Sequence, residues 1–411
     1  MVKYDEVKKI AKKCLKCKNP SCVKGCPLNN PIPEILTLIE NDKITEASDL
    51  LFSNTLVSGI CSKLCDVART CFGNCILSKK NNGVEFFKVE EYLSDKFNED
   101  YFLSQQKNNR QNAIIFGGGI SGIILAIYLS LSNIKVKLIE KENKLGGVIT
   151  QTLPNFRYDD SIINKYVNIL NKLNVDIIYN KEFGRDYKIE DTLKYDICIF
   201  AMGTQIVKNS MYNEDYFLNS LEILKKVKRN EDIISNKTIL VIGGGNVAMD
   251  VARTLNKYDN NVQIVYRRDI ENAPASKKEI NDAIKEGVIF NECLAPIGFN
   301  VVNDKLESLQ VEKMILVDDP SSNRKMFKGT KEYASINCDY VVWAVGLDAD
   351  YGYLKEKLPE LFNEDGWIKE DGIIKNNVQY YATGDYLTGA SNFAKAVNIS
   401  KQIYKKVVEK L

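Results

Sequence analysis

The sequence contains no histidine among its 411 residues. This absence excludes imidazole acid–base catalysis, zinc sites that require histidine ligands, and Rieske-type iron–sulfur centres. We therefore assign no side chain a role as catalytic acid or base, and we expect bound cofactors to supply the chemistry.

A strong net charge is also missing. The 56 basic and 54 acidic residues leave a net charge of +2, so no overall field favours a nucleic acid or a membrane as partner. The opening residues, MVKYDEVKKI, lack the apolar core of a secretory signal. The apolar stretch 113–129 is interrupted by a glycine-rich turn, which argues against a membrane span. These observations predict a cytoplasmic protein.

The cysteines are distributed unevenly, because eight of the eleven lie before residue 76. In a reducing compartment such a cluster indicates metal or iron–sulfur ligation and not disulfides. The alternative, structural zinc, favours paired C-x2-C units, and only one such unit occurs here. Two runs supply enough thiolates for two [4Fe–4S] clusters. The first run is Cys14, Cys17, Cys22 and Cys26, followed by proline, and the second is Cys61, Cys65, Cys71 and Cys75.

A dinucleotide-binding pattern begins at residue 113, with a predicted strand, a G-x-G-x-x-G turn, a helix over 121–131 and a second strand over 136–139. The glycines allow a tight turn and a close approach of the backbone to a pyrophosphate. The acid that ends the second strand can accept hydrogen bonds from a ribose diol, and a later glycine pair suits a second approach to a flavin. The residues expected to contact FAD here are Gly117, Gly119, Ser121, Gly122, Glu140, Gly146 and Gly147.

The same pattern occurs a second time, between predicted strands over 238–242 and 262–266. Its second strand ends in two arginines instead of an acid. Guanidinium groups at this position suit a 2′-phosphate, which favours NADP(H) over NAD(H). The alternative is that both arginines lie on a solvated edge. The residues expected to bind this nucleotide are Gly243, Gly245, Asn246, Val247, Ala248, Asp250, Arg267 and Arg268.

Three further positions follow predicted buried strands. Gly203 is the second-to-last residue of YDICIFAMGT and Gly346 ends the similar stretch CDYVVWAVG, and we expect both glycines to lie at cofactors. Near the C-terminus, a strand over 380–382 leads into Gly384 and Asp385. Asp385 can hydrogen-bond a flavin ribityl chain beside a helix start, or it can simply act as a helix N-cap.

This order predicts an α/β protein with two doubly wound dinucleotide-binding domains, the second inserted in the first, after a small helical domain. The helical domain covers 1–110, with helices over 7–15, 32–41 and 43–54 and a polar linker over 79–109. The FAD domain covers 111–205 and 346–411, and the NAD(P)H domain covers 206–345. Within the latter we expect variable or disordered sequence over 208–232 and hairpins over 288–331.

The chain resembles the NAD(P)H-oxidising half of dihydropyrimidine dehydrogenases, the separate bacterial subunit that feeds electrons to such enzymes, and the glutamate synthase small subunit. The resemblance covers essentially the whole chain. It is carried by the two cysteine runs, FGGGISG, GGGNVAMD followed by YRR, APAS at 273–276 and ATGD at 382–385. Departures are Thr152 in place of a glycine, Ala273 in place of a common methionine, and the lack of a further basic residue soon after Arg268.

The resemblance implies that the two cysteine runs are interleaved. One cluster would take Cys14, Cys17, Cys22 and Cys75, and the other would take Cys26, Cys65, Cys71 and a carboxylate. The segment VEEYLSDKF over 89–97 places Glu90 at that position, with Glu91 as the alternative. Cys61 would then be a packing residue.

The leading hypothesis is an electron-input subunit, in which hydride passes from NAD(P)H to FAD and single electrons pass through two clusters to a partner subunit. Ferredoxin is a further candidate partner. One alternative is a subunit of a ferredoxin-linked transhydrogenase. Another is a diaphorase whose N-terminal part is a zinc or docking module. A dithiol route has no obvious C-x-x-C pair in the nucleotide domain, and we expect Cys198, Cys293 and Cys338 to be buried packing residues.

Overall fold

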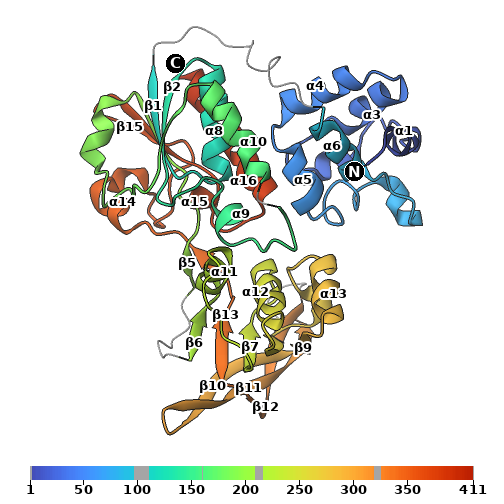
Figure 1. The fold of residues 1–411 in the computed structure, drawn as a ribbon, viewed down its shortest axis with the longest axis vertical. Coiled ribbons are helices and arrows are strands. Elements are labelled where there is room, and N and C mark those ends of the chain that lie inside the picture. Colours follow the sequence, from blue (N-terminus) through green and yellow to red (C-terminus); the bar gives the residue numbers. More distant parts are fainter. Residues whose placement is uncertain (1, 97–110, 160, 209–215, 319–324, 411) are drawn as a thin grey trace. The chain divides into compact units, whose positions relative to one another are not determined.

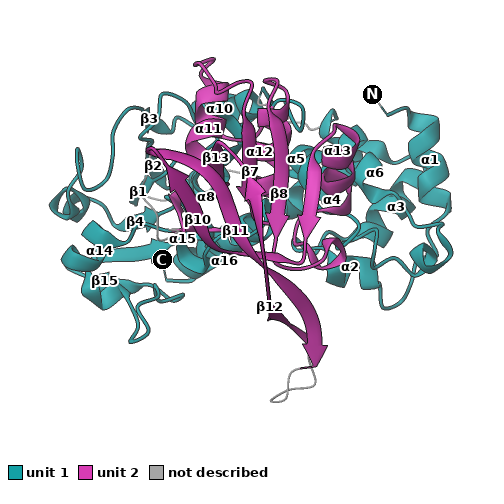
Figure 2. Ribbon diagram, turned by 90° about the horizontal axis from the view of Figure 1, so that it is seen from below, with its two compact units in different colours: residues 1–150, 155–204, 349–411 teal, residues 151–154, 205–348 magenta. Residues whose placement is uncertain are grey.

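The computed structural model describes residues 2–96, 111–159, 161–208, 216–318 and 325–410. The chain forms two compact units (Figure 2). Unit 1 contains residues 1–150, 155–204 and 349–411, and unit 2 contains residues 151–154 and 205–348. The short helices at the N-terminus and the first dinucleotide-binding sheet therefore belong to the same unit.

The N-terminal part of unit 1 is helical (Figure 1). Its elements are α1 (Tyr4–Lys12), α2 (Ser21–Gly25), α3 (Ile32–Glu40), α4 (Ile44–Asn54), α5 (Ser58–Leu64), the 3-10 helix η1 (Ile76–Lys80) and α6 (Phe86–Ser94). Apolar side chains repeat at helical spacing and bury one face of each longer helix in a shared core. Proline in the first turn of α3 fits because an N–H group there has no helical partner.

The predicted linker over 79–109 is wrong for its first half, since α6 lies there. Phe86, Val89 and Leu93 recur at helical spacing and are buried against the other helices. Residues 97–109 of that predicted linker lie outside the described residues.

The main sheet of unit 1 has the strand order β15-β16-β4-β1-β2-β3 within the described residues. The strands are β1 (Asn112–Phe116), β2 (Lys135–Ile139), β3 (Asp176–Ile178), β4 (Ile197–Phe200), β15 (Ile373–Lys375) and β16 (Val378–Ala382). All neighbours are parallel except the edge pair β15 and β16. The central strands are buried along their length, as expected of a parallel sheet covered by helices.

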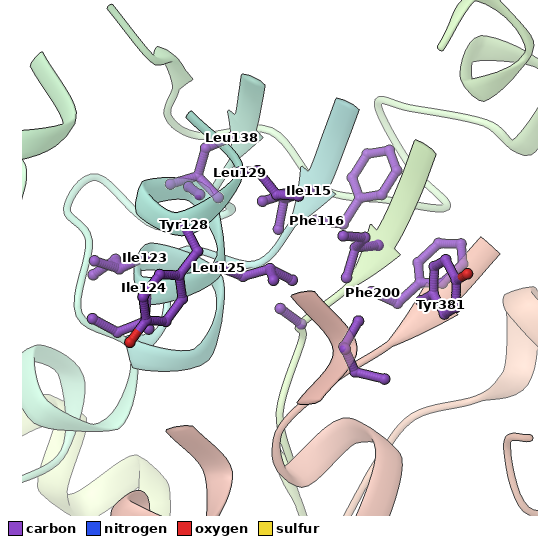
Figure 3. Close-up of a cluster of buried hydrophobic side chains, with 14 of the residues drawn as sticks. Ile115, Phe116, Ile123, Ile124, Leu125, Tyr128, Leu129, Leu138, Phe200 and Tyr381 are labelled. Carbon is purple, nitrogen blue, oxygen red and sulfur yellow. The ribbon is translucent and has the colours of Figure 1, made fainter. Parts of the chain in front are cut away.

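Helices of unit 1 pack on this sheet. They are α8 (Ile120–Leu131), α9 (Val148–Gln151), α10 (Ile162–Lys172), η2 (Ile189–Lys194), α14 (Gly352–Lys357), η4 (Pro359–Leu361), α15 (Asp385–Thr388) and α16 (Phe393–Glu409). Figure 3 shows Leu125 and Leu129 of α8 beside Ile115 of β1, with Phe200 and Tyr381 from the neighbouring strands. The core thus fixes the position where β1 turns into α8.

Unit 2 repeats the arrangement. Its parallel sheet has the order β6-β13-β7-β8-β9 within the described part of the chain. The strands are β6 (Phe217–Asn219), β7 (Thr238–Ile242), β8 (Asn261–Tyr266), β9 (Ile289–Glu292) and β13 (Tyr340–Trp343). The helices are α11 (Ser220–Lys228), α12 (Asn246–Asn256), η3 (Ile270–Asn272) and α13 (Lys277–Lys285).

Antiparallel strands extend unit 2. They are β10 (Leu294–Val302), β11 (Lys305–Asp318) and β12 (Lys325–Asn337), and a short pair joins β5 (Ile206–Val207) to β14 (Leu347–Asp348). The expectation of hairpins over 288–331 therefore agrees with the structure.

The expectation of disorder over 208–232 is wrong for 216–228, where β6 and α11 form and Asn219 caps α11 by accepting from Leu221 N–H. Residues 209–215 lie outside the described ones.

The α/β fold class predicted from the sequence is confirmed. Within the described ranges, no helix has the length and apolar character needed to cross a lipid bilayer.

Candidate functional site

The turn after β1 has a shape that only glycine fits. Gly117 has φ +107°, and its N–H donates to the carbonyl oxygen of Ile139 at 2.8 Å. A Cβ atom on Gly117 would lie 2.4 Å from the carbonyl oxygen of Ala201, and one on Gly122 would lie 1.9 Å from the carbonyl oxygen of Gly117. The backbones of β1, α8 and the end of β4 therefore meet without side chains between them.

Glu140 follows β2 and is held beside this turn. Its Oε2 accepts from Gly118 N–H at 2.7 Å, and its Oε1 accepts from Glu142 N–H at 2.8 Å. The side chain is buried, and burial raises its pKa while the two backbone donors oppose that shift. Each carboxylate oxygen keeps capacity for another hydrogen bond, so both hydroxyls of a ribose diol can be accommodated.

The glycine pair after Glu140 lies against the turn. Gly146 N–H donates to the carbonyl oxygen of Gly118 at 2.8 Å, and Gly146 forms a β-bridge with Gly119. A Cβ atom on Gly147 would lie 2.9 Å from the Cα atom of Gly119. The structure thus brings both predicted glycine stretches together as adjacent bare backbone.

The C-terminal motif approaches the same helix start. Gly384 has φ +61°, and a Cβ atom there would lie 2.2 Å from the Oγ atom of Ser121. Asp385 accepts from the hydroxyl of Ser391 at 2.7 Å, and burial raises the pKa of its carboxyl group. Asp385 is the first residue of α15, whose N-cap is Gly384, so the N-cap alternative for Asp385 does not describe α15.

The long helix α16 begins further along the chain than the motif suggested. Its N-cap is Asn392, whose side chain accepts from Lys395 N–H at 2.9 Å. Gly203, at the end of β4, has φ +66°, and an added Cβ atom would meet nothing within 4 Å. Its open surroundings leave room for a ligand beside the strand end.

The second fingerprint has the same design in unit 2. Gly243 has φ +138°, and a Cβ atom would lie 2.3 Å from the carbonyl oxygen of Ala344. Gly245 precedes α12 in open surroundings, and the buried Ala248 lies where the first fingerprint has its third glycine. Val247 and Asp250 follow in the first turns of α12, and Asp250 is buried.

The APAS segment closes over this turn. Ala275 N–H donates to the carbonyl oxygen of Gly244 at 3.0 Å, and Ser276 N–H donates to Asn246 Oδ1 at 3.1 Å. Ser276 then caps α13 by accepting from Glu279 N–H. From the sequence APAS is only a family feature, whereas these long-range bonds show that it holds the glycine turn.

Arg267 and Arg268 both lie exposed directly after β8, at the carboxyl edge of the sheet of unit 2. Burial raises the pKa of the Tyr266 hydroxyl. The guanidinium of Arg268 interacts with that hydroxyl and lowers the pKa by a smaller amount. Gly346 has φ +126°, and its carbonyl oxygen accepts from Lys208 N–H at 3.0 Å. Exposed guanidinium groups at a strand end can reach an anionic ligand.

The first predicted cluster ligands, which we call the outer set, converge. The outer set is Cys14, Cys17, Cys22 and Cys75. All four border one cavity of about 140 Å³. Burial, together with the neighbouring Cys75 and Cys14, raises the pKa of Cys22 to about 11. Cys17 is exposed, so this set reaches the surface.

The second predicted ligands, which we call the inner set, also lie together. The inner set is Cys26, Cys65, Cys71 and Glu90. Burial raises the pKa of Cys71, and the charges of the other three members raise it further. Burial likewise raises the pKa of Cys65 to about 11.

Glu90 is the carboxylate that faces the inner set. It is buried, and burial raises its pKa to about 8. A 2.9 Å hydrogen bond from Asn30 Nδ2 opposes this rise but is the smaller effect. Glu91 instead forms a 2.7 Å ion pair with Lys63 at the surface. The position of Glu90 in α6 thus favours it over Glu91 as a ligand.

Thiolates are the ligands that hold iron–sulfur clusters, and the outer set gathers four cysteines. The inner set gathers three cysteines and Glu90, the carboxylate that the family resemblance implies. Among the described residues, no three Cys, Asp or Glu side chains converge on a point that would hold one metal ion. The outer sulfurs instead surround a cavity, which suits a group with volume of its own.

The remaining cysteines differ from one another. Cys61, Cys198 and Cys338 are buried, in agreement with packing roles. Cys293 is only half-buried and has φ +57°, so the expectation that it is a buried packing residue is wrong. It lies at a bend directly before β10, and its positive φ belongs to that bend.

Two family models match the chain. One, described as dihydropyrimidine dehydrogenase domain II, 4Fe-4S cluster, matches residues 1–101. The other, described as pyridine nucleotide-disulphide oxidoreductase, matches residues 111–402. The boundary between the two matches falls between α6 and β1 in the sequence.

Similar curated proteins include the glutamate synthase [NADPH] small chain of Escherichia coli, 27% identical over 95% of this chain and 89% of that protein. The chain is also 24% identical to the NADPH-Fe(3+) oxidoreductase subunit beta of Geobacter sulfurreducens, over 82% of this chain and 52% of that protein.

Solved structures share the fold. 2-Naphthoyl-CoA reductase superposes with a TM-score of 0.56 at 15% identity, over 92% of this chain and 52% of that one. Thioredoxin reductase of Lactococcus lactis superposes with a TM-score of 0.50 at 20% identity, over 73% of this chain and 100% of that one.

Proposed function

Since the chain belongs to the pyridine nucleotide-disulphide oxidoreductase family, we propose that it is the electron-input subunit of a larger enzyme. It is an NADPH-dependent oxidoreductase whose cofactors are FAD, NADP(H) and 4Fe–4S clusters. When bound, the nicotinamide and flavin supply two-electron hydride chemistry, and the clusters supply one-electron chemistry. The proposal gives the chain two clusters and a separate partner protein.

The observation that carries this proposal is the pairing of two ligand sets with a glycine turn in one compact unit. The outer and inner sets each mix residues from both cysteine runs, as interleaved clusters require. The turn at Gly117 and the carboxylate of Glu140 belong to the same unit. A zinc or docking module would have no need of two such sets.

Each cofactor contact is assigned to residues of this chain. Gly119 and Gly147 would let the backbone approach a pyrophosphate and the flavin, and Glu140 would fix the ribose. Arg267 and Arg268 would hold the 2′-phosphate of NADPH. Positioning by these residues, and not proton transfer by a side chain, is what a chain without histidine can contribute.

We further propose that the partner docks over the outer set. Leu15 and Ile76 are more than half exposed there and border the same cavity as the cysteines. Lys12, Lys18 and Lys24 are exposed nearby in sequence. An apolar contact with exposed lysines in the same segments suits a one-electron acceptor protein with an acidic face.

The test is anaerobic purification, followed by measurement of flavin, iron and acid-labile sulfide. We expect one FAD and two 4Fe–4S clusters per chain, and NADPH-driven reduction of artificial dyes. Protein with flavin but without iron would support the diaphorase alternative and refute the proposal.

Co-purification from the native host then tests the partner. A catalytic subunit that accepts single electrons supports the proposal. A second flavoprotein that exchanges electrons with ferredoxin would favour the transhydrogenase alternative. A Lys18→Glu variant should slow transfer to an acidic partner while dye reduction stays unchanged.

A further inference from the structure

A chain of hydrogen bonds connects α16 to Glu90 through two asparagines. Lys401 Nζ donates to Asn54 Oδ1 at 2.8 Å and to the Asn54 carbonyl oxygen at 2.6 Å. Asn54 Nδ2 donates to Asn30 Oδ1 at 2.8 Å, and Asn30 Nδ2 donates to Glu90 Oε1 at 2.9 Å. Its longest single step, from Lys401 to Asn54, joins residues that lie 347 positions apart in the sequence.

The direction of every bond in this chain is fixed by its first member. A lysine ammonium can only donate, so Asn54 must turn its oxygen toward Lys401 and its NH2 group toward Asn30. The Asn54 NH2 group also donates to the Leu28 carbonyl oxygen at 3.0 Å, which supports the same orientation. Asn30 is then left with its NH2 group facing Glu90.

Asn30 contacts two members of the inner set. Its side chain donates to Glu90 Oε1, and its backbone N–H hydrogen-bonds the thiol of Cys26. Asn30 and Glu90 are both more than nine-tenths buried, so neither can exchange this contact for water. With Oε1 occupied by Asn30, the Glu90 carboxylate is held in one orientation.

We propose that Lys401, Asn54 and Asn30 are positioning residues that orient Glu90 as a cluster ligand and tune the reduction potential of the inner cluster. The inference rests on the proposed function, because it assumes that the inner set holds a cluster. Hydrogen bonds and charges around a cluster set its potential, and Lys401 supplies a positive charge at the end of the chain. Docking of α16 against α4 would thereby control a ligand in α6.

Two variants separate this role from a simple structural clamp. Lys401→Met removes the cation that orients both amides. Asn54→Asp keeps an oxygen for Lys401 and strengthens that pair, but it has no NH2 group for Asn30. If Lys401 and Asn54 only hold α16 against α4, Asn54→Asp should leave the inner cluster unchanged. If the direction of the hydrogen bonds matters, the Asn30 amide should flip in this variant and turn its oxygen toward Glu90.

Lys405→Met is the matched control. Lys405 lies one turn further along α16 and is exposed, and it adds to the lowering of the Lys401 pKa that burial mainly causes. The control therefore removes a neighbouring positive charge and leaves the contacts of Asn54 in place.

The experiment is an anaerobic redox titration of full-length protein, followed by electron paramagnetic resonance and iron analysis. We expect Lys401→Met to lower the potential of one cluster only, and Asn54→Asp to change the spectrum of that cluster or halve the iron content. Lys405→Met should match the wild type. Variants that hold full iron and give two unchanged cluster signals would overturn the inference alone. Wild-type protein without clusters would overturn the proposed function and the inference together.

Discussion

The carboxylate of Glu140 offers the sharpest test of the FAD site. A Glu140→Gln variant keeps the size and shape of the side chain but replaces one acceptor oxygen with an NH2 donor. In the structure each oxygen already accepts from a backbone N–H, one from Gly118 and one from Glu142. Whichever way the glutamine amide turns, one of these backbone donors faces another donor, and one ribose hydroxyl loses its acceptor.

The magnitudes separate the effect on FAD binding from the effect on stability. A hydrogen bond to a charged group is worth about 1.5–3 kcal/mol, so one lost ribose contact weakens FAD binding by roughly 10- to 150-fold. The unpaired backbone donor costs about 1–3 kcal/mol in stability. That cost is offset in part, because burial raises the pKa of Glu140 and a neutral glutamine avoids the desolvation of a charge. Affinity is therefore the more sensitive quantity.

The assay is fluorescence titration of flavin-free protein with FAD, which gives the dissociation constant directly. Glu142→Gln is the matched control, since its backbone N–H still donates to Glu140. If Glu140→Gln binds FAD within threefold of the wild type, the carboxylate does not hold the ribose and the assignment is wrong.

Four further outcomes follow from the geometry. Arg267→Ala should raise KM for NADPH about tenfold and leave KM for NADH unchanged, and an equal loss with both nucleotides would reject the phosphate contact. In cluster-free protein, burial raises the pKa of Glu90 from 4.5 to about 8. The unfolding free energy should therefore fall as pH rises through that window, by up to about 5 kcal/mol relative to Glu90→Gln in urea titrations, and parallel curves would contradict this. Gly384→Ala should lower FAD content, because the strained φ costs about 1–2 kcal/mol and the new Cβ atom meets the Ser121 hydroxyl, and adding Ser121→Ala should restore part of it. Cys17→Ser should alter the signal of one cluster in electron paramagnetic resonance and spare the other.

The two glycine turns could be predicted because their requirements are local. The backbone at Gly117 and Gly243 needs a positive φ and a close carbonyl neighbour, and both needs appear in a short motif. Strands β1 and β2 accordingly begin one residue before their predicted positions and end where expected. The α/β class follows from the repetition of this motif.

Other features could not be predicted because their causes are distant in the sequence. Helix α6 lies in a polar stretch, and its apolar face becomes evident only beside the helices it packs against. Asn30 follows a cysteine run without any motif of its own, and its partners Glu90 and Asn54 lie 60 and 24 residues away. The half-buried position of Cys293 could not be predicted, because composition does not reveal a residue with positive φ.

The two ligand sets lie in different surroundings, and these surroundings indicate which set is nearer to solvent. Cys26 of the inner set packs against the core that contains β1 and α8, together with the buried Leu28 and Cys61. Cys14, Cys22 and Cys75 of the outer set pack against the core of the short helices, which also contains Cys71 of the inner set, and Cys17 is exposed. A protein that approaches from solvent therefore meets Cys17 of the outer set first, while Cys71 and Glu90 of the inner set are buried. Because potentials respond to burial and hydrogen bonding, a partner that docks over the outer set should shift the potential of the outer cluster more than that of the inner cluster.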